Sequence, residues 1–148
     1  MGHAAGQHYS MGDWGHRGSL FDADFDIADA FKIVITTPAT GSYWLAEDVS
    51  SATVCKVTVT EGITNATGDG TELVLYGRSR QKDHPNECAC AAEYGGTYTG
   101  GTEILKKVEM RGEPGNAFLL KPSTAYLITV TSKAADNYAS CVVWVWEA

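Results

Sequence analysis

Short runs of alternating apolar and polar residues, separated by turn-forming residues, recur along most of this chain. In the clearest run, Thr53–Glu61, the apolar residues Cys55, Val57 and Val59 alternate with lysine and threonine. Successive side chains of a strand point to opposite faces, so this run predicts a strand with one buried and one solvated face. No stretch has a convincing helical period, and the pattern as a whole indicates an all-β protein.

About eight runs of strand length follow residue 30. They are 31–37, 42–47, 53–61, 72–77, 94–98, 103–110, 118–121 merging into 126–131, and 140–146. Eight antiparallel strands with long connections favour a jelly roll, a β-sandwich whose double-sheet order limits the number of exposed sheet edges. An immunoglobulin-like sandwich is the alternative. A chain of 148 residues has the size of one domain.

The first 29 residues differ from the rest and are predicted to form an extended N-terminal arm, with the β-domain spanning 30–148. The segment has five glycines, three histidines and an acidic-aromatic stretch at 21–29. Its apolar residues, among them Trp14, Phe21 and Phe25, are too irregularly spaced to predict a helix. Such an arm is expected to pack either on its own barrel or on a neighbouring subunit.

The charge balance excludes one class of partner. The chain has 11 basic and 18 acidic residues and a formal net charge of −7, which would repel a phosphate backbone. Its longest apolar run, 141–146, is far shorter than the roughly 20 residues of a membrane-spanning helix. No basic-then-apolar signal pattern opens the chain. We therefore expect neither a nucleic acid nor a membrane as partner.

Two groups of side chains contain residues that can bind metal ions. Asp22, Asp24 and Asp26 imitate the start of a calcium loop, but isoleucines stand where that loop needs a glycine and a glutamate. Cys88 and Cys90 lie close to His84, yet no second Cys/His pair follows at the spacing of a zinc finger. No catalytic set is evident either, so we expect a protein without cofactor, metal or enzymatic activity.

Four residues near the end of two predicted strands have two interpretations each. Trp144 and Trp146 lie on one face of the last strand, where at least one is expected in the core, although the pair could stack on sugar or protein. Arg78 and Arg80 share one side of a short segment. They are either solvated loop charges or part of a subunit contact, because arginine is enriched at interfaces.

Three places in the chain resemble one family. Residues 33–40 run from a strand into "T-T-P"; residues 60–62 open a turn that leads to "Y-G-R-S-R" at 76–80; and 120–128 read "L-K-P-x-T-x-Y-L-I" before a terminal "W-x-W-E". In order and spacing these resemble the jelly-roll decoration, or cement, proteins that stabilise the heads of tailed phages. Gly77 and Ser79 stand where that family has asparagines.

The resemblance implies a virion structural protein. It would be made in the host cytoplasm, bind the capsid surface and clamp neighbouring subunits of the major capsid protein as a homodimer or homotrimer. The interface is expected at Trp14, Arg17, Phe21, Phe25, Arg78 and Arg80. The alternative is a carbohydrate- or receptor-binding module of a phage tail fibre, since a fold of this kind hosts several functions.

Overall fold

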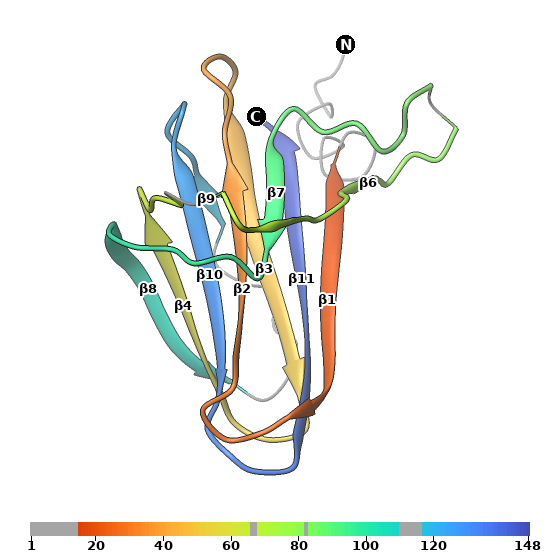
Figure 1. Cartoon of the computed structure of the whole chain (residues 1–148). Helices are drawn as coiled ribbons and strands as arrows, with labels where there is room; N and C mark the ends of the chain where they lie inside the picture. Colours follow the sequence, from red (N-terminus) through yellow and green to blue (C-terminus); the bar gives the residue numbers. More distant parts are fainter. Residues whose placement is uncertain (1–14, 66–67, 82, 110–116) are drawn as a thin grey trace.

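The computed structural model describes residues 15–65, 68–81, 83–109 and 117–148. These residues form eleven strands and no helix, in two antiparallel sheets packed as a sandwich (Figure 1). The all-β prediction is confirmed. There are three more strands than the predicted eight. The run 72–77 divides into β5 and β6, the merged run 118–131 divides into β9 and β10, and β1 was not predicted.

The two sheets contain five and six strands. The first has the order β6 (Tyr76–Gly77), β1 (His16–Phe25), β11 (Asn137–Glu147), β3 (Tyr43–Ser51), β9 (Phe118–Leu119). The second has the order β5 (Thr71–Glu72), β7 (Ala91–Tyr94), β2 (Ala30–Thr36), β10 (Ala125–Ser132), β4 (Cys55–Glu61), β8 (Thr102–Glu109).

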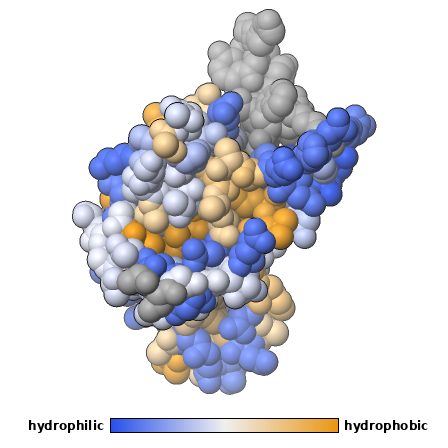
Figure 2. Space-filling view, turned by 45° about the horizontal axis from the view of Figure 1, so that its top comes forward, coloured by the Kyte–Doolittle hydropathy of each residue, from blue (hydrophilic) through white to orange (hydrophobic). Residues whose placement is uncertain are grey.

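The strands alternate between the sheets from β1 to β4 and again from β8 to β11. The turns β1–β2, β3–β4 and β10–β11 all cross from one sheet to the other at the lower end of the sandwich in Figure 1. As a result, the order β1-β11-β3 in one sheet lies opposite the order β2-β10-β4 in the other. The long loop between β6 and β7 projects from the upper end, and its surface is strongly hydrophilic (Figures 1 and 2).

The core lies between the sheets and follows the alternation of the strands. In β4, Cys55, Val57 and Val59 are at most 1% exposed, as the sequence predicted. Cys141 is equally buried in β11 and, like Cys55, forms no disulfide and packs as a small apolar side chain. One ion pair, between Glu47 and Lys107 at 3.0 Å, also lies inside this layer.

The boundary predicted at residue 30 is wrong, because residues 16–25 form β1 inside the five-stranded sheet. This strand pairs with β11 from His16 opposite Val145 to Phe25 opposite Asn137. A register shift between Asp22 and Phe25 breaks the two-residue period there, which is why the sequence did not reveal a strand. Residues 1–14 of the predicted arm lie outside the described residues.

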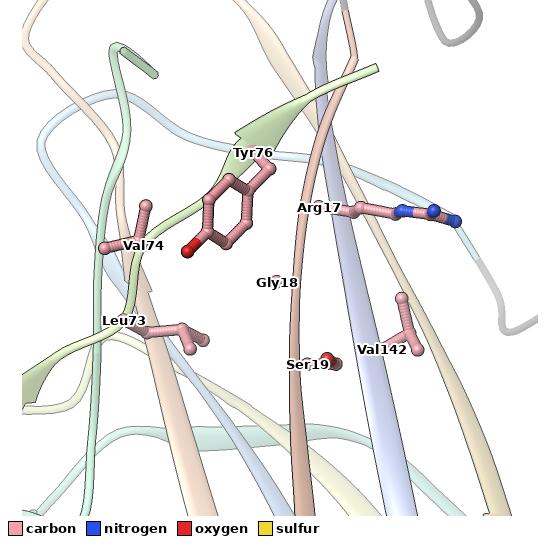
Figure 3. Close-up of a pocket in the computed structure, with 7 residues that line it drawn as sticks. All are labelled: Arg17, Gly18, Ser19, Leu73, Val74, Tyr76 and Val142. Carbon is pink, nitrogen blue, oxygen red and sulfur yellow. The ribbon is translucent and has the colours of Figure 1, made fainter. Parts of the chain in front are cut away.

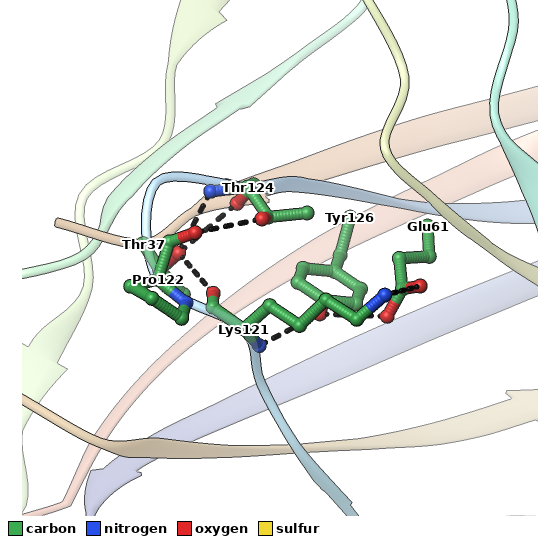
Figure 4. A network of polar contacts seen from close by, with 6 residues as sticks. All are labelled: Thr37, Glu61, Lys121, Pro122, Thr124 and Tyr126. Carbon is green, nitrogen blue, oxygen red and sulfur yellow. Dashed lines mark hydrogen bonds and ion pairs between the residues drawn. The ribbon is translucent and has the colours of Figure 1, made fainter. Parts of the chain in front are cut away.

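Hydrogen bonds around Tyr126 fasten the turn before β10 to the end of β4 (Figure 4). The Tyr126 hydroxyl donates to Glu61 Oε2 at 2.9 Å and accepts from the Lys121 backbone N–H at 2.9 Å. Lys121 Nζ lies 3.0 Å from Glu61 Oε1. The tyrosine side chain is 1% exposed, so its ring is a core residue and its hydroxyl closes the turn.

Thr37 fastens the same turn to the end of β2. Its hydroxyl donates to the Lys121 carbonyl at 2.6 Å and accepts from the Thr124 N–H at 3.0 Å. Three of the segments on which the family resemblance rests, 36–38, 60–62 and 120–128, therefore meet in one network. In this chain, these segments stabilise the fold, because their polar groups bond to one another.

Two phenylalanines of β1 provide a matched test of its place in the sandwich. Phe25 is 1% exposed and Phe21 is 67% exposed. Phe25→Ala should lower the free energy of unfolding by about 3–5 kcal/mol, because it leaves a cavity in the core. Phe21→Ala should change it by no more than about 0.5 kcal/mol. Urea denaturation measures both; equal effects would contradict the position of β1.

The Glu61 carboxylate should make stability depend on pH. Hydrogen bonds from Lys121 and Tyr126 lower its pKa, so its contribution is present at neutral pH and is lost as the pH falls below about 4. Glu61→Gln should therefore cost about 1 kcal/mol at pH 7 and clearly less near pH 3. Urea denaturation of both proteins at the two pH values tests this; a constant difference would contradict it.

Candidate binding face

The outer face of the five-stranded sheet has four aromatic side chains, Trp44, Tyr76, Trp144 and Trp146, which we call the aromatic face. Tyr76 is 51% exposed, and the three tryptophans are half-buried. The inward positions of β11 are occupied by Cys141, Val143 and Val145. The expectation that Trp144 or Trp146 packs in the core is thus wrong, since smaller side chains fill that side of the strand.

Strand register aligns these side chains in rows across the sheet. Trp144 lies opposite Arg17 of β1, and Arg17 lies opposite Tyr76 of β6. In the next row, Trp146 lies opposite Trp44, with their rings stacked at 6.3 Å and an interplanar angle of 16°. Directly opposed residues share one face of a sheet, so the aromatic groups form a continuous surface over several strands.

Three arginines, Arg17, Arg78 and Arg80, lie at the β6 corner of the aromatic face, and we call them the arginine cluster. The guanidinium carbons of Arg17 and Arg78 lie 5.3 and 5.1 Å from the ring centroid of Trp144. That of Arg80 lies 5.6 Å from the ring centroid of Tyr76. A cation over an aromatic face is stabilised by about 0.5–1 kcal/mol at an exposed site, so the rings orient these side chains.

The arginine cluster presents three positive charges at the surface. Within the described ranges, none of the three guanidinium groups pairs with a carboxylate. The hydrogen bond of Arg80 goes to the neutral Asn86 Oδ1, at 2.6 Å. All three side chains are exposed. On a protein with a net charge of −7 this corner is locally positive.

A groove of about 630 Å³ adjoins the cluster (Figure 3). It is lined by Arg17, Gly18, Ser19, Leu73, Val74, Tyr76 and Val142. The segment before β6 packs so closely on β1 that a Cβ atom at Gly18 would lie 2.8 Å from the Leu75 side chain. Glycine at this position therefore lets residues 73–75 approach the strand, and Leu73 and Val74 form one wall of the groove.

The predicted interface residues have three different locations. Arg17, Arg78 and Arg80 come together as the arginine cluster, and Phe21 lies on the same outer face, 67% exposed. Phe25 is a core residue, and its prediction as an interface residue is wrong. Trp14 lies outside the described residues.

The candidate metal ligands have other interactions. His84 Nδ1 lies 3.2 Å from Glu87 Oε1, on the exposed loop after β6. Hydrogen bonding from Cys90 lowers the pKa of the Cys88 thiol, while hydrogen bonding to Cys88 and burial raise the pKa of Cys90. The described part of the chain has no group of three or more side chains arranged to hold a metal ion.

The acidic residues that imitate the start of a calcium loop accept short-range backbone hydrogen bonds at the end of β1 and in the β1–β2 turn. Asp22 Oδ1 accepts the Asp24 N–H at 2.9 Å, and Asp26 Oδ1 accepts the Ile27 N–H at 2.8 Å. Asp29 Oδ2 accepts the Asp26 N–H at 3.0 Å. Such short-range bonds from aspartate to backbone are typical of turns.

Sequence reasoning missed Trp44 and Tyr76 as members of the binding face. Trp44 stands between the buried residues Tyr43 and Leu45, so apolarity on both sides of β3 hid its direction. Val49 continues the apolar alternation of Tyr43 and Leu45 and is the only signal on that side, because the buried Glu47 interrupts the pattern with a charge. Tyr76 gave no such signal, because its strand has only two residues.

The comparisons with known proteins do not add to this picture. No protein-family model matches the chain, and no curated protein matches it. The described residues contain no helix that is long and apolar enough to cross a membrane. Proposals about function therefore depend on the sequence motifs and on the geometry of the binding face.

Proposed function

We propose that this protein is a non-enzymatic capsid decoration protein, which binds the outer surface of a phage head and joins neighbouring major capsid subunits. The aromatic face with its arginine cluster is the observation that carries the proposal. Tryptophan, tyrosine and arginine are the residues most enriched among the energetic centres of protein interfaces. Here, they are gathered on a sheet face instead of being used for the core.

The strand order supports the jelly-roll form of the sandwich. The order β1-β11-β3-β9 opposite β2-β10-β4-β8, with paired strands crossing between sheets, is the arrangement expected of a jelly roll. It disfavours the immunoglobulin-like alternative, in which the pairing between sheets differs. Jelly rolls occur in viral capsid and lectin domains, so the fold is compatible with the proposed role and with the alternative below.

The family resemblance connects this fold to the virion. Its motifs at 36–38, 60–62 and 120–128 form the network around Tyr126, which gives them a physical role in this chain. We propose that a homodimer or homotrimer on the capsid surface contacts several subunits at once. Such multivalent contact raises the effective concentration of each further binding event and suits a clamping protein.

Capsid binding should depend on Trp144. Trp144→Ala removes the ring that orients Arg17 and Arg78, and should weaken co-sedimentation with expanded capsids lacking this protein by about 30-fold, or about 2 kcal/mol. Tyr138→Ala is the matched control, because Tyr138 is an exposed aromatic residue at the other end of β11. Absence of capsid binding by the unmodified protein would contradict the proposed function.

The alternative function is carbohydrate or receptor binding by a tail-fibre module, and the stacked pair Trp44–Trp146 favours it. Two nearly parallel indole rings on a sheet face provide an apolar platform of the kind on which sugar rings stack. If this function is correct, a glycan array should detect specific binding that Trp146→Ala abolishes. Glycan binding that survives this substitution would exclude the pair as the sugar site.

A further inference from the structure

We propose that the arginine cluster and the adjoining groove bind an acidic, extended segment of a partner protein, in which carboxylates flank an apolar side chain. The inference rests on the proposed binding function and names the chemistry of its partner. Arg17, Arg78 and Arg80 would receive the carboxylates, and the groove beside β1 would receive the apolar side chain (Figure 3).

Charge complementarity is the first argument. Acidic residues outnumber basic ones by 18 to 11, yet three of the four arginines gather at this one corner. None of the three pairs with a carboxylate in the described part of the chain. A concentration of exposed, oriented guanidinium groups on an otherwise acidic protein is complementary to carboxylates supplied by another molecule.

The geometry of the guanidinium groups is the second argument. Arg17 and Arg78 both lie over the ring of Trp144, at 5.3 and 5.1 Å from its centroid, so they can contact one ligand together. A guanidinium group that stacks on a ring keeps N–H donors at its edge, in a fork that fits a carboxylate. Because the ring already orients the side chains, less conformational entropy is lost on binding.

The groove distinguishes a protein ligand from other anions. Leu73, Val74 and Val142 contribute only aliphatic side chains to its lining, which suit an apolar side chain better than the hydroxyl groups of a sugar. A nucleic acid would be repelled by the net charge of −7. The site therefore favours a peptide with both acidic and apolar side chains over an acidic polysaccharide or a phosphate backbone.

Two capped pentapeptides test the inference on the full chain. The probe is Glu-Glu-Leu-Glu-Glu, and its neutral control is Gln-Gln-Leu-Gln-Gln. The indole N–H signal of Trp144 in a ¹⁵N NMR spectrum, assigned with Trp144→Phe, reports binding. We expect the acidic peptide to bind at least about tenfold more tightly than the neutral one. Its affinity should also fall between about 0.1 and 1 M NaCl, as the Debye length shortens from about 10 to 3 Å.

Charge-reversal variants locate the site. Arg17→Glu/Arg78→Glu should weaken acidic-peptide binding by at least about tenfold. Lys106→Glu/Lys133→Glu makes the same change in net charge at exposed lysines away from the aromatic face and should leave binding unchanged. Arg80→Glu, on the exposed loop end of the cluster, is the variant of choice if the double arginine variant fails to fold. Equal binding of the two peptides, or full affinity in folded arginine variants, would overturn the inference.

Binding assays with capsids and with a polysaccharide distinguish this inference from the proposed function. If the unmodified protein and the arginine variants bind capsids equally well, the inference fails and the decoration role stands. If the acidic peptide binds but capsids do not, the decoration role fails and the acidic ligand stands. Binding of alginate, a polyuronate, without binding of the acidic peptide would overturn the protein partner in favour of a glycan.

Discussion

The alternation of β11 is the constraint on which the rest of the structure depends. This strand is central in its sheet and pairs with β1 on one side and β3 on the other. Its inward residues, including Cys141, Val143 and Val145, form part of the core, while Trp144 and Trp146 face outward. Since the side-chain period of a strand is two, a register slip of one residue would bury the tryptophans and expose the valines. The register of β11 thus determines both which side chains pack in the core and which form the binding face.

The outward tryptophans would be a liability on a bare sheet, because exposed apolar patches promote association. Here, they are partly covered by cations and by one another. Arg17 and Arg78 lie over Trp144, and Trp146 stacks on Trp44. This covering reduces the apolar area that the face exposes, and it still leaves apolar area and oriented charge accessible at the surface.

The strands of the β-domain could be predicted from sequence because alternation and turn residues act locally. Residues 55–61 show this best, with Cys55, Val57 and Val59 buried as expected. β1 could not be predicted, because Asp22, Asp24 and the register shift before Phe25 hide its period. The direction of Trp144 could not be predicted either, since both faces of β11 are apolar and the period does not say which one is inside. The gathering of Arg17 with Arg78 depends on strand register, and no local pattern records which strands pair.

The motifs that suggest a family and the residues that suggest binding lie in different parts of the molecule. Segments 36–38, 60–62 and 120–128 hold the turn before β10 through Thr37, Glu61 and Tyr126. A likeness confined to those segments would argue for a shared fold and not for a shared partner, because their polar groups are used internally. The remaining segment, 76–80, is the one that supplies Tyr76, Arg78 and Arg80 to the binding face. Gly77 and Ser79, which stand where the resembled motif has asparagines, fall between these residues. A Cβ atom at Gly77 would collide with the carbonyl oxygen of Pro85, so the loop after β6 can pack on this strand only because residue 77 is glycine.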